Sequence, residues 1–192
     1  MKKITIITPT YNRAKTLPKV FESLLKQSFK DFIWIILDDG STDNTTEVVE
    51  NFQLFNPFFE IIYKKDKNRH KFLTVLEGVK MVKTPYFMVV DSDDIYPEDA
   101  LETLISEVEK IENQDNYVAV MGLSADENGK IVGNQYPNNG FDGSIFEMRY
   151  KHKVRGDKFG IFITKTYQRE ISGKDFSQYE GKGYIPQSVI FN

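Results

Sequence analysis

The chain has 192 residues, a formal net charge of −3 and no cysteine. This length fits one large domain, and the slightly acidic balance argues against a nucleic-acid partner, which would favour a strongly basic face. Without cysteine, neither a disulfide nor a thiolate metal site can form. No segment reaches the roughly 20 apolar residues that a transmembrane helix needs, so we expect a soluble, cytoplasmic protein with at most peripheral contact at the inner face of a membrane.

Short β-branched runs alternate with segments of helical spacing in the first half of the chain. The predicted strands are 3–8, 32–39, 58–65 and 86–91, and the predicted helices are 17–28, 72–82 and 98–112. A further helix is expected to begin near Thr45. This alternation predicts an α/β fold with a mixed, mostly parallel sheet and helices on both faces, with Trp34 packed in the core.

The second half of the chain has a different character. Residues 117–133 predict two short strands joined at Asn128-Gly129, a strong hairpin signal, and residues 135–143 predict a surface loop. Residues 157–168 predict a strand, followed by a loop that enters a helix within 180–192. Because that helix has barely begun where the sequence stops, we expect the chain to be truncated at this end or to be a short relative of a longer protein.

Three polar clusters follow predicted strands: TPTYNR at 8–13, DDGSTDNT at 38–45 and DSDD at 91–94. In an open α/β sheet, ligands bind beyond the carboxyl ends of the strands, where the winding changes direction. We therefore expect the three clusters to converge on one edge of the sheet.

The DDGSTDNT cluster has two interpretations. In the first, Gly40 permits a turn, and Ser41, Thr42 or Asp43 caps the following helix. A cap does not explain both Asp38 and Asp39, because one carboxylate would suffice. A carboxylate there could accept the imide N–H of a uracil ring.

The DSDD cluster, Asp91 to Asp94, could likewise be a turn before a helix whose first-turn acids favour the dipole. The preceding apolar run predicts a central strand, however, and hence a buried approach to the charges. Two carboxylates separated by one residue can both reach Mg²⁺ or Mn²⁺, which bridge to phosphate oxygens. The sequence favours a site for a divalent cation and a diphosphate, and an EF-hand is excluded.

The basic run KKDKNRHK at 64–71 is either a solvated face or part of an anion site. It lies at the start of a predicted helix, where the dipole attracts phosphate. Arg69 and Lys71 are the candidates for that contact.

In order and spacing, TPTYNR, DDGSTDNT, Lys71 with Gly78, and DSDD resemble the motifs of family 2 glycosyltransferases of the GT-A fold. The resemblance is strong over about residues 3–113. It implies a single domain, 1–192, with a nucleotide-sugar donor half at 1–113 and an acceptor half at 114–192. It also implies transfer of a sugar from a nucleotide diphosphate sugar, with UDP-sugar favoured, to a glycan or lipid-linked acceptor hydroxyl, with inversion and with Mn²⁺ or Mg²⁺ as cofactor.

The resemblance assigns residue roles. The donor-binding set is Pro9, Thr10, Tyr11, Arg13, Asp39, Lys71, Asp91 and Ser92. Tyr11 would lie against the base, and Asp39 would accept the N–H of the base. Asp91 and Asp93 would form the metal-binding Asp-x-Asp motif, with Asp93 as the more direct and catalytic ligand and Asp91 facing the ribose or the sugar.

The sequence departs from the family pattern at several positions. An acidic residue that accepts the proton of the acceptor hydroxyl is expected late in the chain, but Gln187 occupies that position. Arg69-His70 replaces two glycines, and Leu76 replaces an asparagine. Substitute bases are Glu180, Asp175 and Asp157.

Two other functions remain open. One is a nucleotide-sugar-binding domain without transfer activity, because of Gln187 or a missing C-terminal part. The other is a nucleotidyltransferase, which is disfavoured because TPTYNR is not a glycine-rich basic loop. Tyr136 and Phe141 are candidates for acceptor contact, and His70 and His152 are expected to face solvent.

Overall fold

The structure, a computed structural model, describes residues 2–114, 116–183 and 185. It divides into two compact units: a first unit of Met1–Val120 with Ile161–Asn192, and a second unit of Met121–Gly160.

The described residues form one six-stranded sheet. Its strands are β1 (Ile4–Thr10), β2 (Phe32–Asp38), β3 (Glu60–Lys65), β4 (Tyr86–Val89), β5 (Ala119–Leu123) and β6 (Lys158–Ile163). The strand order is β3-β2-β1-β4-β6-β5. The pairs β1/β2, β1/β4 and β2/β3 are parallel, whereas β6 runs antiparallel to β4. The mixed, mostly parallel sheet is therefore confirmed.

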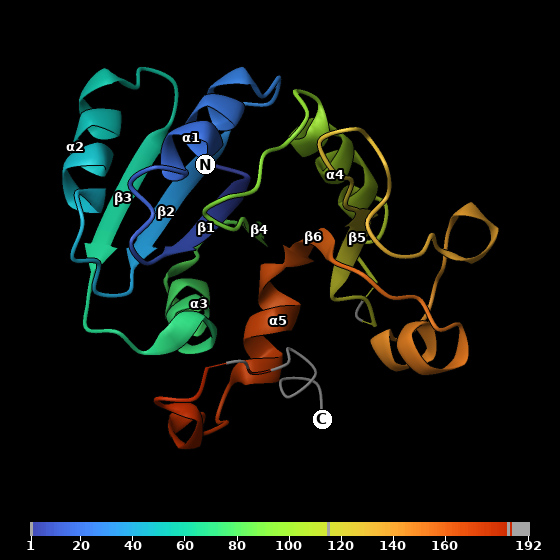
Figure 1. Cartoon of the computed structure of the whole chain (residues 1–192). Helices are drawn as coiled ribbons and strands as arrows, with labels where there is room; N and C mark the ends of the chain where they lie inside the picture. Colours follow the sequence, from blue (N-terminus) through green and yellow to red (C-terminus); the bar gives the residue numbers. More distant parts are fainter. Residues whose placement is uncertain (1, 115, 184, 186–192) are drawn as a thin grey trace. The chain divides into compact units, whose positions relative to one another are not determined.

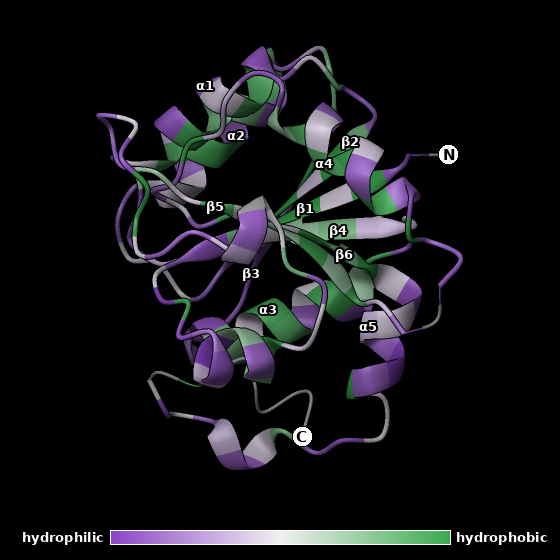
Figure 2. Cartoon of the chain, turned by 90° about the vertical axis from the view of Figure 1, so that its right-hand side faces the viewer, coloured by the Kyte–Doolittle hydropathy of each residue, from purple (hydrophilic) through white to green (hydrophobic). Residues whose placement is uncertain are grey.

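Five α-helices lie in the described part of the first unit. They are α1 (Leu17–Lys26), α2 (Thr45–Phe55), α3 (His70–Met81), α4 (Ala100–Glu109) and α5 (Thr164–Ile171). Helices α1, α2 and α4 cover one face of the sheet, and α3 and α5 cover the other (Figure 1). Figure 2 shows hydrophobic residues along the strands and on the helix surfaces that face them. The prediction of helices on both faces is confirmed.

Burial explains why the central strands form as they do. Every residue of β1 is buried, and β2 is buried except at one position, as expected for strands covered on both faces. Trp34 is fully buried and donates from Nε1 to Thr8 Oγ1 at 2.8 Å. Its prediction as a core residue is confirmed, and the hydrogen bond satisfies its polar atom.

Helix α3 packs unusually close to the sheet at Gly78. A Cβ atom at this position would lie 2.7 Å from Leu37 Cδ1 and 2.8 Å from Ile7 Cγ2. Glycine at this position therefore allows α3 to approach the strands β1 and β2 this closely.

Two predictions in the second half were wrong in part. Residues 164–168 were expected to continue a strand but begin α5, which follows β6 without a loop. The turn at Asn128-Gly129 is present, because Asp126 N–H donates to Lys130 C=O and Gly129 N–H to Asp126 C=O. The arm after the turn makes only one isolated bridge, Ala125 with Ile131, and β5 pairs with β6 instead.

Candidate active site

The three polar clusters meet at one edge of the sheet in the first unit, as predicted. β1 lies between β2 and β4, so the chain changes winding direction between β1 and β4. Asp39 N–H donates to Thr10 C=O at 2.8 Å, which joins the ends of β2 and β1. Arg13 and Asp93 form an ion pair of 3.6 Å, which joins the loops after β1 and β4.

The loops after β1 and β2 are bonded to one another. Asn12 N–H donates to Ser41 Oγ at 2.8 Å, and the Asn12 side chain accepts from Thr42 N–H at 2.8 Å. Asn12 has a positive φ of 54°, a conformation that asparagine tolerates better than most residues. Ser41 and Thr42 therefore hold the loop after β1 and do not cap α2, which corrects the capping interpretation for these two residues.

Asp43 makes contacts both to the start of α2 and to the loop after β1. Its carboxylate accepts from Thr45 Oγ1 at 2.6 Å and from Thr45 N–H at 3.1 Å at the start of α2, and from Ala14 N–H at 3.2 Å. These hydrogen bonds, led by that from the Thr45 hydroxyl, lower the pKa of Asp43. Asp43 thus accepts from the N–H of the first residue of α2, although the N-cap residue itself is Asn44, which makes no side-chain capping hydrogen bond.

Asp38 has a structural partner set. It is 1% exposed, and its carboxylate accepts hydrogen bonds from Ser41 N–H at 2.6 Å and from the hydroxyl of Tyr63 on β3. Burial and this hydrogen bond raise the pKa of Tyr63 to about 12. One of the two adjacent carboxylates is therefore used to join β2, β3 and the turn.

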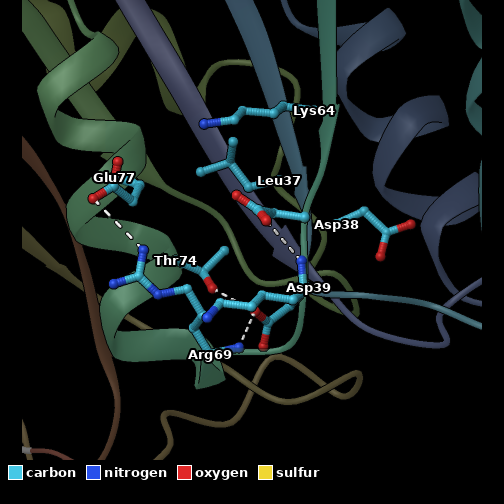
Figure 3. A pocket seen from close by; sticks show the side chains of 9 residues that line it. Leu37, Asp38, Asp39, Lys64, Arg69, Thr74 and Glu77 are labelled. Carbon is cyan, nitrogen blue, oxygen red and sulfur yellow. Dashed lines mark hydrogen bonds and ion pairs between the residues drawn. The ribbon is translucent and has the colours of Figure 1, made fainter. Parts of the chain in front are cut away.

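Asp39 links β2 to the first turn of α3 beside a small hollow (Figure 3). Its Oδ1 accepts from Arg69 N–H at 2.7 Å and from Thr74 Oγ1 at 2.8 Å. Both hydrogen bonds use the same oxygen, so Oδ2 keeps its accepting capacity. Sequence reasoning missed Thr74, although its position one helical turn after His70 is a usable signal.

The hollow beside Asp39 has mixed charge. Its lining residues are Leu37, Asp38, Asp39, Lys64, Asp66, Lys67, Arg69, Thr74 and Glu77. In Figure 3, Arg69 extends toward Glu77, and their ion pair measures 3.9 Å. Gly40, with φ of 86°, allows the turn to approach this loop, since a Cβ there would lie 3.1 Å from Asn68 N.

Each carboxylate of the Asp91/Asp93 pair faces a basic side chain. Lys71 Nζ lies 2.5 Å from Asp91 Oδ2, and Arg13 Nη2 lies 3.6 Å from Asp93 Oδ2. All four side chains are partly exposed, between 39% and 59%. Among the described residues, no group of three His, Cys, Asp or Glu side chains could hold a metal ion.

The other predicted donor residues line the same edge. Pro9 and Ser92 are buried, whereas Tyr11 is 47% exposed. The hydroxyl of Thr10 is buried and has no hydrogen-bond partner in the described part of the protein. A buried hydroxyl without a partner is unfavourable, so it suggests a ligand group at this position.

A C-terminal segment of the first unit packs on α3. The rings of Phe176 and Tyr179 meet Phe72 edge-on, at centroid distances of 5.8 and 5.6 Å. Glu180 forms ion pairs with Lys67 at 3.4 Å and with Arg69 at 3.9 Å. Glu180 thus lies beside the wall of the hollow, which its position in the sequence did not predict.

The other residues considered for the base, Gln187, Asp175 and Asp157, lie in different parts of the chain. Gln187 lies outside the described residues. Asp175 accepts from Ser177 N–H and Oγ, and these hydrogen bonds lower its pKa. Asp157 is exposed in the second unit.

The aromatic acceptor candidates and the histidines are placed as follows. In the second unit, the buried Tyr136 hydroxyl has no partner among the described residues, and Phe141 packs edge-on against the exposed His152 at 4.9 Å. His70, the first residue of α3, has a φ of 65° and is only partly exposed. No helix within the described ranges is both long and apolar enough to cross a membrane.

Comparison with known proteins agrees with this geometry. Residues 5–174 match the sequence profile described as glycosyl transferase family 2. The poly(ribitol-phosphate) beta-N-acetylglucosaminyltransferase TarP of Staphylococcus aureus is 32% identical over 100% of this chain and 56% of TarP. Glycosyltransferase GlyG of Streptococcus pneumoniae is 29% identical over 74% of this chain and 42% of GlyG. The chain thus spans only about half the length of these relatives.

Solved structures show the same fold. S. aureus TarS has a TM-score of 0.64 at 20% identity, over 88% of this chain and 29% of TarS, and TarS 1-349 has been solved with UDP and with UDP-GlcNAc. A mannosyltransferase from Pyrobaculum calidifontis, in complex with GDP-Man and Mn²⁺, has a TM-score of 0.62 at 16% identity, over 91% of this chain and 48% of that protein.

The chain belongs to glycosyl transferase family 2. This membership confirms the family and the GT-A fold that the resemblance implied.

Proposed function

We propose that the first unit binds a uridine diphosphate sugar with a divalent cation, and that the protein transfers the sugar to an acceptor hydroxyl in glycan synthesis with inversion. The observation that carries this proposal is the buried, partnerless hydroxyl of Thr10. Thr10 lies at the end of β1, which leads to Arg13, and the carbonyl of Thr10 accepts a hydrogen bond from Asp39 N–H. A nucleotide at this edge would give the hydroxyl a partner.

The nucleoside would lie at the ends of β1 and β2. The exposed ring of Tyr11 offers a surface for the base, and Oδ2 of Asp39 can accept an imide N–H. Asp39 is 6% exposed and fixed by Arg69 and Thr74, so its orientation is set before a ligand arrives.

The diphosphate would lie between the loops after β1 and β4. Asp91 and Asp93 supply hard oxygen ligands of the type that Mg²⁺ and Mn²⁺ prefer, and two carboxylates suit an ion that takes its other ligands from water and phosphate. When bound, such an ion stabilises negative charge on the leaving diphosphate. Arg13 and Lys71 lie within ion-pair distance of these carboxylates and would then turn to the phosphate oxygens.

In the transfer step, the oxygen of the acceptor hydroxyl forms a bond to the anomeric carbon while the bond to UDP breaks. The hydroxyl proton needs an acceptor. Asp175 is a poor base because its pKa is lowered, whereas Glu180 lies at the wall of the hollow with two cationic partners. If neither Glu180 nor the region around Gln187 supplies a base, the protein is a nucleotide-sugar-binding domain without transfer activity.

The relatives support the choice of donor and acceptor. TarS binds UDP and UDP-GlcNAc, TarP is named for poly(ribitol-phosphate), and a Campylobacter jejuni relative is named for an undecaprenol-linked acceptor. We infer a UDP-sugar donor and a glycan or lipid-linked acceptor for this chain.

Calorimetric titration of UDP in the presence of Mn²⁺ tests the donor site. We expect binding that is lost on chelation and in Asp93→Asn. Asp31→Asn is a matched control, because Asp31 is also an exposed acid paired with a lysine, Lys2, at 3.5 Å, but it precedes β2 at the opposite edge. Equal binding by Asp93→Asn and the parent protein would refute the placement of the diphosphate. Release of UDP from UDP-GlcNAc with an acceptor glycan then separates a transferase from a binding domain.

A further inference from the structure

The second unit carries a segment of exposed apolar and basic side chains, residues 145–155, which we call the basic-aromatic segment. It contains the π-helix Glu147–Lys151. Ile145, Phe146 and Tyr150 are 37%, 40% and 71% exposed. The rings of Phe146 and Tyr150 stack at a centroid distance of 6.1 Å, so they form one apolar surface.

The charge of this segment is opposite to that of the whole chain. Its basic side chains are Arg149, Lys151, Lys153 and Arg155, all exposed. Its one acid, Glu147, is paired with Lys151 at 3.6 Å. Four basic side chains and one acid give this segment a formal charge of +3 within a protein of net charge −3, and the positive charge lies beside the exposed apolar side chains.

The basic-aromatic segment is held in place by one buried side chain, Val154, and by backbone hydrogen bonds. Val154 is 5% exposed, and Val154 N–H donates to Met148 C=O at 3.0 Å. Arg155 exchanges two hydrogen bonds with Asn134, from Asn134 N–H to Arg155 C=O at 2.9 Å and from Arg155 N–H to Asn134 Oδ1 at 3.1 Å. The apolar and basic side chains are therefore presented together by a defined backbone.

We propose that the basic-aromatic segment is a docking surface for an anionic lipid membrane. Basic residues are attracted to the negative surface potential of anionic lipids. Amphipathic aromatic rings prefer the level of the lipid headgroups, and apolar side chains gain free energy by entering the acyl boundary. A soluble polyanion would engage the four basic side chains but offers no apolar phase to Ile145, Phe146 and Tyr150. This proposal is independent of the donor site.

Co-sedimentation of the full chain with vesicles tests the proposal. We expect binding to vesicles of phosphatidylcholine mixed with phosphatidylglycerol, little binding to phosphatidylcholine alone, and weakening as salt is raised. The double variant Phe146→Ser, Tyr150→Ser should bind at least about tenfold more weakly, because it removes most of the apolar contact. Phe55→Ser, Phe58→Ser is the matched control, since these exposed rings lie in the first unit, and its binding should be unchanged.

A second variant distinguishes lipid from other anions. Trp34 is fully buried, so its emission should stay constant while that of Tyr150→Trp reports the surface. A blue shift of Tyr150→Trp with anionic vesicles, and none with soluble polyphosphate, is expected. Binding to polyphosphate without preference for vesicles, or equal vesicle binding by both double serine variants, would overturn the proposal. Lys151→Glu, Lys153→Glu should also abolish vesicle binding, and retained binding would likewise overturn it.

Discussion

Replacement of Lys71 by methionine should change the binding of metal and of nucleotide in opposite directions. Lys71 Nζ lies 2.5 Å from Asp91 Oδ2, and the two side chains are 59% and 39% exposed. A cation that bound Asp91 would compete with this ammonium group for the carboxylate. A metal ion that arrives alone must displace it, whereas a metal ion that arrives with a diphosphate gives it new partners.

The exposure of the pair sets the magnitudes. An exposed ion pair contributes at most about 1 kcal/mol, so Lys71→Met should strengthen the binding of Mn²⁺ alone by up to about fivefold. A hydrogen bond to a charged phosphate contributes about 1.5–3 kcal/mol, so the same variant should weaken the binding of UDP with Mn²⁺ by about 10- to 150-fold.

Calorimetry of Mn²⁺ alone and of UDP with Mn²⁺ measures both effects. Lys80→Met is the control, because Lys80 is also on α3 and pairs with Glu77 at 3.1 Å outside the Asp91/Asp93 pair. A fall in affinity for Mn²⁺ alone would show that Lys71 does not compete with the metal. An unchanged affinity for UDP would remove Lys71 from the phosphate contacts.

Two further predictions concern stability. Gly78→Ala would place its Cβ atom 2.7 Å from Leu37 Cδ1 and 2.8 Å from Ile7 Cγ2. We expect the free energy of unfolding to fall by about 1–3 kcal/mol, and an unchanged denaturation midpoint would contradict this packing. For Tyr63, burial and the hydrogen bond to Asp38 raise the pKa to about 12, so the folded protein holds this proton more tightly than the unfolded chain. The associated stability is present below about pH 10 and is lost as the pH rises toward 12. Tyr63→Phe should lose less stability over this interval, and identical alkaline unfolding curves would refute the assignment.

The sheet and most helices could be predicted from the sequence because apolar residues recur at short, regular intervals within each of these elements. The apolar stripe of α3 and the β-branched residues of β1 and β2 are local patterns that survive in the folded protein. Helix α5 was missed for a local reason: it has only eight residues, it follows β6 directly, and an apolar residue, Ile163, stands at its N-cap. A helix that begins without a cap signal reads as a continuation of the strand.

The location of the candidate site could also be predicted, but its internal contacts could not. The rule that ligands bind at the carboxyl ends of strands brings the three polar clusters together. The hydrogen bonds between Asn12 and Ser41, and the pairing of Arg13 with Asp93, join residues far apart in sequence. Such contacts leave no periodic signal in the sequence. The different partners of Asp38, which binds Ser41 and Tyr63, and of Asp39, which binds Arg69 and Thr74, are likewise visible only in the structure.

The contacts of helix α3 limit which segments could be exchanged between members of the family in a chimaeric protein. Arg69, the N-cap residue of α3, and Thr74, within the helix, hold Asp39, while Phe72 packs against Phe176 and Tyr179. A chimaera that imports only the loop before α3 would therefore mismatch the segment that leads toward Gln187. Because Phe72 contacts Phe176 and Tyr179, and Glu180 pairs with Lys67 and Arg69, we expect residues 66–74 to tolerate exchange only together with residues 176–180.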